Sequence, residues 1–256
     1  MRLFAEHLAK TAGRKIIAEF YRLHRQDIRF KTRREVVTKA DLIAEKIILS
    51  AIRKKFPDHS ILSEESGWDK HKRSPYLWIV DPLDGTTNFS YHNPLFAVSI
   101  ALLRDGQIVL GVIYVPFLDI MISAEQGKGA RWNGKPIHVS AKQQIAKSFL
   151  TFCHGNSKQD LRRGLAAYHR VKQKFFDVRQ LGSAAMEMAW VGAGYVDGYF
   201  SPGARSWDVA AGVLIVREAG GIVTDFKGRP WTIESQEIVA SNKTIHPFIL
   251  KHLRDL

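Results

Sequence analysis

An apolar segment that ends at one aspartate, with a second aspartate three residues later, constrains this chain more than any other feature. Residues 76–80 (YLWIV) form a run typical of a buried strand, and Asp81 follows without a spacer. Pro82 fixes its own φ angle, and Asp84 comes three residues after Asp81, so the two carboxylates can converge across the turn. Gly85 then permits a tight backbone that a ligand can approach closely. We therefore predict a pair of acids at the rim of a buried core.

Two further segments place acids beside apolar elements. They are residues 63–66 (SEES) and residues 207–212 (WDVAAG). Like charges about 4 Å apart repel by about 4 kcal/mol at an effective dielectric constant of about 20, so acids that meet need a cation or raised pKa values. Oxygen ligands alone favour Mg²⁺, Mn²⁺ or Ca²⁺ over Zn²⁺. Because Thr86 and Thr87 can offer amides to an anion, the joint pattern suggests metal-assisted phosphoryl transfer to water.

Each group of acids also has an ordinary interpretation when it is taken alone. The sequence DPLDG at residues 81–85 fits a simple turn. Glu64 and Glu65 fit a solvated loop, and Asp208 fits the capping position of a helix. The functional hypothesis therefore depends on the three segments occurring together.

The remaining pattern predicts a fold that mixes helices with hairpin strands, of class α+β or layered α/β. Helices are expected at residues 1–25, 40–56, 158–174, 183–191, 207–219 and the C-terminus. Strands are expected at residues 60–63, 76–80, 96–103, 108–115, 119–124, 149–152, 197–200, 222–224 and 238–240. We divide the chain into an N-terminal half, residues 1–140, with most of the acids, and a C-terminal half, residues 141–256, with Asp208. Together they are expected to form one compact catalytic unit.

Charge and apolar content narrow the partners and the location. The chain has 256 residues and a formal net charge of +13, which favours phosphorylated metabolites, nucleic acid or acidic lipid. Its single cysteine, Cys153, excludes an intramolecular disulfide and a cysteine-based metal cluster. The longest apolar stretch, residues 94–103, is shorter than the roughly 20 residues that span a bilayer. The N-terminus shows no signal peptide, so we expect a cytoplasmic protein that does not insert into a membrane.

The joint pattern resembles the inositol monophosphatase family, within the lithium-sensitive, Mg²⁺-dependent phosphatases that include fructose-1,6-bisphosphatases. The likeness extends over nearly the whole chain. It is carried by residues 37–41 (VTKAD), 63–66 (SEES), 78–89 (WIVDPLDGTTNF), 182–185 (GSAA) and 207–212 (WDVAAG). The resemblance implies an αβαβα sandwich, often assembled as a homodimer. It also implies hydrolysis of a small phosphate monoester with two or three Mg²⁺ ions, or with Mn²⁺.

The resemblance further implies the metal ligands. Glu64, Asp81 and the carbonyl group of Leu83 would bind one ion. Asp81, Asp84 and Asp208 would hold a second ion, and a third, weaker ion would lie near Glu64.

For catalysis, the resemblance assigns the attacking water to Thr86, with Asp41 behind it and Glu64 beside it. The amide groups of Gly85 and Thr86 would hold the substrate phosphate. The residues implied in substrate binding are Asp84, Gly85, Thr86, Gly182, Ser183, Ala184, Ser201, Arg205 and Asp208.

One position departs from the pattern of the family. Inositol-selective members commonly carry a glutamate seven residues before the aspartate of the Trp-Asp motif, and this chain has Ser201 there. The neutral side chain leaves room for fructose 1,6-bisphosphate beside inositol 1-phosphate. Arg205 and Arg179 could meet a second phosphate, although Arg179 also fits an ordinary surface position.

Two other functions stay open from the sequence. One is a 3′-phosphatase that acts on adenosine 3′,5′-bisphosphate. The other is a regulator associated with nucleic acid or transcription, which the net charge suggests. The basic segment 158–174 fits such a contact and also fits a solvated helix face. Trp68 and residues 69–73 fit a loop that closes over the acids as a lid.

Overall fold

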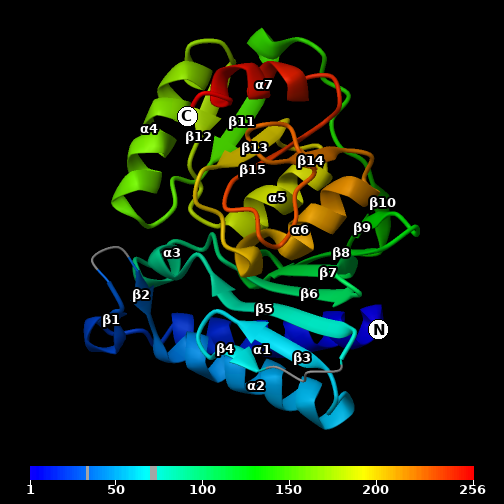
Figure 1. Cartoon of the computed structure of the whole chain (residues 1–256). Coiled ribbons are helices and arrows are strands. Elements are labelled where there is room, and N and C mark those ends of the chain that lie inside the picture. The colour runs from blue at the N-terminus through cyan, green and yellow to red at the C-terminus, as the bar shows by residue number, and fades with distance from the viewer. Residues whose placement is uncertain (33–34, 70–73) are drawn as a thin grey trace.

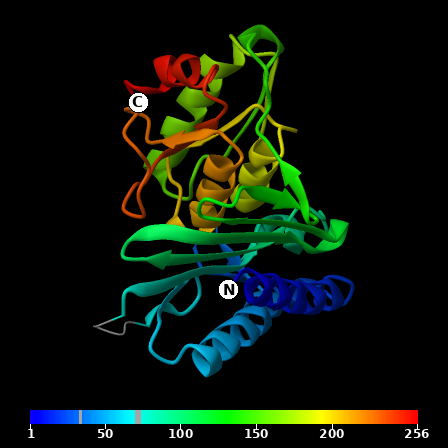
Figure 2. The same ribbon diagram turned by 90° about the vertical axis from the view of Figure 1, so that its right-hand side faces the viewer.

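Helices and sheets alternate in layers through the computed structural model, in the order helices, sheet, helices, sheet, helices (Figure 1). The structure describes residues 1–32, 35–69 and 74–256. Figure 2 shows the stack from the side, with the N-terminus in the first helical layer and the C-terminus in the last. The αβαβα arrangement that the family resemblance predicted is therefore confirmed.

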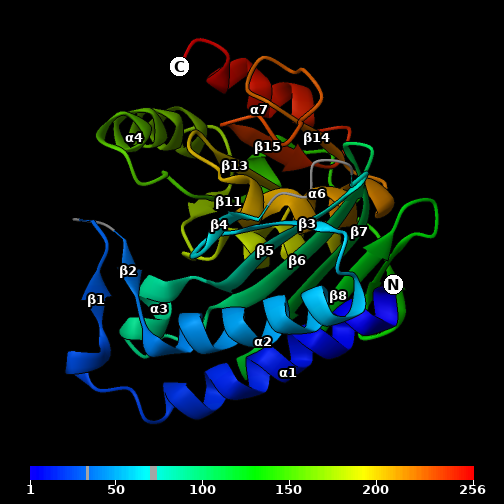
Figure 3. The same ribbon diagram turned by 60° about the horizontal axis from the view of Figure 1, so that its bottom comes forward.

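The first helical layer consists of α1 (Arg2–Phe20) and α2 (Lys39–Lys55), which lie side by side against the first sheet (Figure 3). Buried positions in both helices follow helical spacing, so each helix presents one apolar stripe to the sheet. Thr38 caps α2: its hydroxyl accepts the N–H of Ala40, and its own N–H donates to Asp41. This capping box fixes Asp41 at the start of the helix.

The first sheet contains eight strands among the described residues, in the order β10-β9-β8-β7-β6-β5-β3-β4. Neighbouring strands are antiparallel except β3 and β5, which are parallel. Their bounds are β3 (Ser60–Ser63), β4 (Gly67–Asp69), β5 (Tyr76–Asp84), β6 (Ala97–Arg104), β7 (Gln107–Val115), β8 (Ile120–Glu125), β9 (Ala130–Trp132) and β10 (Lys135–Ile137). Helices cover both faces, which explains why the central strands are continuous apolar runs in the sequence.

Helices α5 (Ala184–Gly192) and α6 (Ser206–Glu218) fill the layer between the two sheets (Figure 1). Both are apolar on almost every side, as a helix buried on two faces requires. A Cβ atom on Gly111 of β7 would lie only 2.5 Å from the carbonyl oxygen of Ala211 on α6. The backbone of α6 therefore rests directly on the first sheet, and its N-terminal end comes close to the end of β5.

The second sheet contains five strands in the described part of the chain, in the order β12-β11-β13-β15-β14. β11 is parallel to β12 and β13, whereas β15 is antiparallel to β13 and β14. Their bounds are β11 (Phe149–Phe152), β12 (Asp177–Arg179), β13 (Gly198–Ser201), β14 (Ile222–Thr224) and β15 (Ile238–Ser241). Helices α4 (Lys158–Lys172) and α7 (His246–Leu253) form the outer layer.

The structure adds short elements that the sequence pattern did not reveal. After α1 ends at Phe20, a 3₁₀ helix (Arg25–Asp27) leads to a hairpin of β1 (Arg29–Phe30) and β2 (Val36–Val37). A short helix, α3 (Thr86–Ser90), follows β5, and further 3₁₀ turns span Pro116–Leu118 and Ile145–Lys147. Segments of two to five residues are too short to show a period, so periodicity could not predict them.

The lid prediction was wrong for Trp68. This residue lies in β4, where it pairs with Leu62 of β3. Pairing with a neighbouring strand, which no local pattern shows, decides its structure. Residues 70–73 of the expected lid lie outside the described residues.

The boundary between the expected halves falls between the two sheets. The first sheet ends at Ile137 and the second begins at Phe149. The division into halves at residue 140 stays a prediction. Within the described ranges, no helix has the length and apolar character needed to cross a membrane.

Candidate active site

A β-bulge at the end of β5 brings Asp81 and Asp84 to the same side of the sheet. Residues an odd number apart point to opposite faces of a regular strand. Here Asp81 pairs with Ser99 and Asp84 pairs with Ala97, so three steps along β5 match two along β6. The extra residue reverses the alternation and turns both carboxylates toward one side. The N–H of Leu83, inside the bulge, donates to Asp81 Oδ1 over 3.0 Å.

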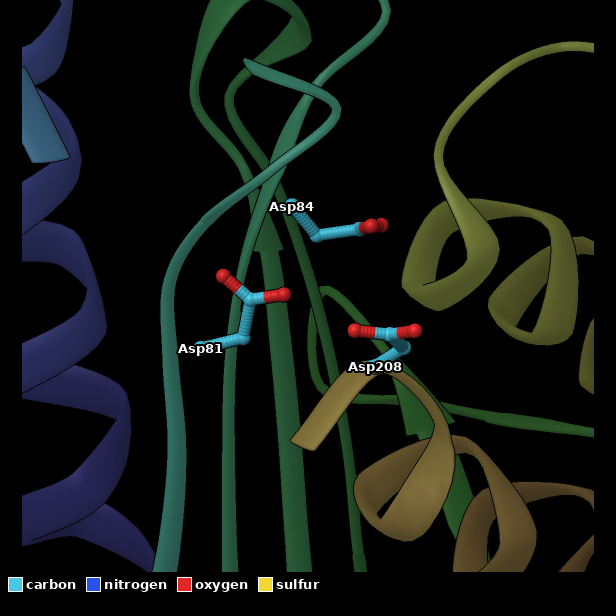
Figure 4. Close-up of side chains that lie close together, drawn as sticks. All are labelled: Asp81, Asp84 and Asp208. Atoms are coloured by element: carbon cyan, nitrogen blue, oxygen red, sulfur yellow. The ribbon is translucent and has the colours of Figure 1, made fainter. Parts of the chain in front are cut away.

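Asp208 reaches the same point from the layer of central helices. It is the third residue of α6, and its carboxylate accepts the N–H of Arg205 over 3.2 Å. In the described part of the chain, carboxylate oxygens of Asp81, Asp84 and Asp208 lie within 4.8 Å of one another (Figure 4). We call these three residues the acid triad. Arg205, not Asp208, is the N-cap of α6, so the ordinary interpretation of Asp208 as the N-cap was wrong; Asp208 accepts the N–H of the N-cap and also belongs to the cluster.

Burial and mutual repulsion raise the pKa values of the acid triad. Burial is the largest cause for each member, and neighbouring carboxylates add to it. Burial raises the pKa of Asp84 to about 6. Hydrogen bonds from Ser183 and Ala185 stabilise the ionised form and so limit this rise. A bound cation would cancel the repulsion that otherwise favours protonation. Two buried carboxylates and a half-buried one suit a hard divalent ion, so the residues present fit the metal that the resemblance implies.

Glu64 lies beside the acid triad, and its carboxylate forms an ion pair with Lys31. Its N–H donates to the carbonyl of Val80 over 3.2 Å, which keeps it beside the end of β5. Its Oε1 lies 3.2 Å from Lys31 Nζ, and Lys31 also pairs with Glu65. Of the four acids expected to meet, the structure brings three within 4.8 Å and holds the fourth beside them. Nothing in the sequence spacing signalled Lys31.

Thr86, Asp41 and Leu83 form a connected group behind the acid triad. The Thr86 hydroxyl lies 3.0 Å from Asp41 Oδ1 and 2.9 Å from the carbonyl oxygen of Leu83. Asp41 is fully buried, and Thr38 donates to its Oδ2 from the N–H (2.8 Å) and from the hydroxyl (2.7 Å). Burial raises the pKa of Asp41 to about 6, against the effect of these hydrogen bonds. The structure thus brings the predicted pair of Asp41 and Thr86 into contact.

A cavity of about 710 Å³ opens over the acid triad, with walls from both halves of the chain. Among the predicted substrate-binding residues outside the triad, five line it: Gly85, Thr86, Gly182, Ala184 and Ser201. Ser201, which stands where inositol-selective relatives carry glutamate, is buried at the end of β13. The cavity therefore joins residues that lie more than a hundred positions apart in the sequence.

Three other predicted residues make contacts of a different kind. The hydroxyl of the buried Ser183 donates to Asp84, so it supports the acid triad. Arg205 is the exposed N-cap residue of α6, and its backbone N–H donates to the Asp208 carboxylate. Arg179 lies 2.7 Å from Asp177 in an exposed ion pair, which agrees with its ordinary surface interpretation.

A buried glutamate that the sequence analysis did not select supports the turn that carries Glu64. Glu45 on α2 accepts hydrogen bonds from the hydroxyl of Ser63 (2.5 Å), and from the N–H (3.0 Å) and hydroxyl (2.6 Å) of Ser66. It therefore holds the turn at both ends. The available signal was its position four residues after Asp41, on the same face of the helix.

Known proteins resemble the chain over almost its whole length. An inositol-1-monophosphatase of Mesorhizobium japonicum is 39% identical over 251 residues, covering 96% of this chain and 93% of the relative. A Nus factor SuhB of Pasteurella multocida is 39% identical over 247 residues (96% and 92%). A fructose-1,6-bisphosphatase/inositol-1-monophosphatase of Thermotoga maritima is 38% identical over 223 residues (87% and 84%). The crystal structure of the suppressor protein suhB of Bartonella henselae superimposes with a TM-score of 0.92 at 36% identity, covering 98% of this chain and 97% of that one.

The fold, the acid site and these relatives define an enzyme of the phosphatase class, a hydrolase of phosphate esters. The sequence profile of the inositol monophosphatase family matches residues 1–256. The chain belongs to the inositol monophosphatase family, and the resemblance recognised in the sequence is confirmed.

Proposed function

We propose that this protein uses Mg²⁺ to hydrolyse inositol 1-phosphate, with fructose 1,6-bisphosphate as a second substrate. The observation that carries the proposal is the acid triad, whose carboxylates converge within 4.8 Å beside a cavity of about 710 Å³. The names of two relatives, an inositol-1-monophosphatase and a fructose-1,6-bisphosphatase/inositol-1-monophosphatase, support these two substrates.

The ligand roles in this proposal follow the family pattern. Glu64, Asp81 and the carbonyl of Leu83 would hold one Mg²⁺, and Asp81, Asp84 and Asp208 would hold another. Bound Mg²⁺ would lower the pKa of a water molecule and stabilise the charge of an in-line displacement. Burial of the carboxylates supports this role, because low local polarity strengthens their attraction for a cation.

Thr86 and Asp41 would guide the proton of the attacking water. The Thr86 hydroxyl can accept a proton from water while it donates its own to Asp41 Oδ1, 3.0 Å away. The pKa of Asp41, raised to about 6 by burial, suits a group that accepts a proton near neutral pH. The amides of Gly85 and Thr86 would hold the phosphate. A Cβ atom on Gly85 would lie 2.9 Å from the carbonyl oxygen of Leu95, so that position requires glycine.

Phosphate release by the purified chain tests the proposal. We expect release from inositol 1-phosphate and fructose 1,6-bisphosphate that requires Mg²⁺. The variant Asp84→Asn should lose at least about 100-fold in kcat, because the metal loses a charged ligand. The control Asp197→Asn changes a buried aspartate that caps the backbone at Phe149, and it should keep its activity. Release from adenosine 3′,5′-bisphosphate alone would replace the proposed substrates, and no release from any ester would refute the proposal.

A second candidate function is association with nucleic acid or a transcription partner. The relative named Nus factor SuhB and the net charge of +13 favour it. Helix α4 carries part of that charge, although Arg163 and Lys172 form ion pairs with acidic neighbours. The double variant Arg162→Glu, Arg170→Glu should weaken binding to RNA in a salt-dependent manner, whereas Asp84→Asn should leave it unchanged. RNA binding that is unaffected by the α4 variant would exclude this surface.

The homodimer implied by the family resemblance stays a prediction. Light scattering of the native chain would test it, and a monomer at high concentration would contradict it.

A further inference from the structure

A fully buried glutamate on α5, Glu187, contacts the backbone turn next to the acid triad. It is 0% exposed, and its Oε1 accepts the backbone N–H of Leu181 over 3.2 Å and of Gly182 over 3.0 Å. The thiol of Cys153 lies 3.5 Å from the same oxygen. The proposed reaction gives Glu187 no role, and the sequence analysis did not select it. A buried carboxyl group that accepts two backbone N–H groups is nevertheless well suited to fix a turn.

The second carboxyl oxygen of Glu187 belongs to a group of buried polar atoms. In the described residues, Glu187 Oε2, Thr151 Oγ1 and the Tyr199 hydroxyl have no hydrogen-bond partner. Thr151 and Tyr199 are paired across β11 and β13, and each interacts with Glu187. Burial raises the pKa of Glu187 to about 8, although the N–H groups of Leu181 and Gly182 oppose the rise. A raised pKa favours the protonated carboxyl group, whose O–H can donate to either hydroxyl.

The same turn contacts the acid triad on its other side. We call residues 181–185 the support turn. The hydroxyl of Ser183 and the N–H of Ala185, over 2.8 Å, both donate to Asp84 Oδ2. The support turn is thus held between Glu187 and Asp84. A displacement on the Glu187 side would move the donors that orient the Asp84 carboxylate.

We propose that Glu187 is a positioning residue that holds the support turn against Asp84 and so sets the affinity of the acid triad for a divalent metal. Without its carboxyl group, two N–H groups in a half-buried turn would lose their acceptor, and the turn would relax to find another. Ser183 and Ala185 would then no longer fix Asp84. The inference rests on the proposed function only in assuming that the triad binds metal.

Two substitutions of Glu187 test the proposal, with a matched control. Glu187→Gln keeps an acceptor for the two N–H groups and donors for the hydroxyls, whereas Glu187→Met keeps the volume and removes both. The control is Glu218→Met. Glu218 also accepts two backbone N–H groups, those of Gly127 and Gly129, over 2.8 Å each. This turn lies outside the cavity. Mn²⁺ and Mg²⁺ affinities are measured by titration calorimetry, and exchange of the amides in the support turn by mass spectrometry.

We expect Glu187→Met to weaken metal binding by about 10- to 100-fold, the usual effect of losing a group that orients a metal ligand. Amide exchange in the support turn should accelerate in the same variant. Glu187→Gln and Glu218→Met should retain native metal affinity and native exchange there. Thermal unfolding of each variant establishes that it is folded.

Two results would overturn the inference. One is a folded Glu187→Met variant with native metal affinity and native exchange in the support turn. The other is a Glu187→Gln variant as impaired as Glu187→Met, because an acceptor for the two N–H groups would then not be what holds the turn. A native chain that binds metal and responds to these variants, yet releases no phosphate, would refute the proposed reaction and leave the positioning role intact.

Discussion

Replacing Asp208 by asparagine should stabilise the metal-free protein and abolish its stabilisation by Mg²⁺. Without a cation, Asp208 adds a third, half-buried carboxylate to the buried Asp81 and Asp84. Asparagine has nearly the same size, and its amide oxygen can still accept the N–H of Arg205 that caps α6. The substitution therefore removes charge from the acid triad without removing volume or a helix cap.

The distances in the acid triad set the magnitude. Two unit charges 4.8 Å apart repel by about 3.5 kcal/mol at an effective dielectric constant of about 20. A fully ionised Asp208 would face two such neighbours, for a total of about 7 kcal/mol. Protonation relieves much of this repulsion, as the raised pKa of Asp208 indicates. We therefore expect a gain of about 1 to 3 kcal/mol in the free energy of unfolding at mildly alkaline pH.

The assay is urea unfolding in the presence of a chelator and again with Mg²⁺ in excess. The native chain should gain about 2.7 kcal/mol when free Mg²⁺ is about 100 times its dissociation constant, and Asp208→Asn should gain almost nothing. Asp197→Asn is the control, because Asp197 is a buried aspartate whose partner is the N–H of Phe149. It should lose stability in the chelator and keep the gain from Mg²⁺. An Asp208→Asn variant that is less stable than the native chain in chelator, or that keeps the Mg²⁺ gain, would refute the reasoning.

Three further predictions concern other parts of the structure. Glu45→Ala should lower kcat by about 10- to 100-fold and the free energy of unfolding by about 1 to 3 kcal/mol, because the turn that carries Glu64 loses its acceptors. Steady-state kinetics and urea unfolding measure both effects, and unchanged kcat would contradict the role. Gly111→Ala should destabilise the fold by about 2 to 4 kcal/mol, since the new Cβ would lie 2.5 Å from the carbonyl oxygen of Ala211. A variant whose thermal unfolding temperature equals that of the native chain would contradict the close packing of α6. Burial lowers the pKa of His246 to about 4 from its usual 6.5, so the unfolded chain binds the proton more tightly. The contribution of His246 to the free energy of unfolding should then be at its maximum above pH 6.5 and fall by about 3 kcal/mol as the pH drops toward 4. A His246→Gln variant should lose this part of the pH dependence, and an equal loss in both proteins would refute the assignment.

Local signals predicted much of the framework. An Asp-Gly pair lies between the strands expected at residues 96–103 and 108–115, and it forms their turn with Asp105 at φ +50° and Gly106 at φ +76°. The helix expected at residues 40–56 is α2, which spans Lys39–Lys55. The apolar run at residues 76–80 became the buried β5. These features depend on a few neighbouring residues, so a single sequence is sufficient to recognise them.

Other parts of the site depend on pairing between distant segments. Asp81 and Asp84 share a side only because β5 bulges against β6, and a bulge is defined by the partner strand. Lys31 meets Glu64 from a hairpin that no periodicity revealed. Glu187 looked like an ordinary polar residue in a small helix, and only its burial against β11 and β13 gives it a place near the site.

The sequence by itself determined the chemistry of the site and the family: which acids follow which apolar elements, and the motifs that the family shares. The tertiary structure decided which of those acids converge, which one pairs with a lysine, and which buried residues support them. The physical reason is how far apart in the sequence the interacting residues lie. Strand ends, caps and turns arise from interactions between residues close in the chain, whereas convergence, burial and pKa depend on how separate layers pack against each other.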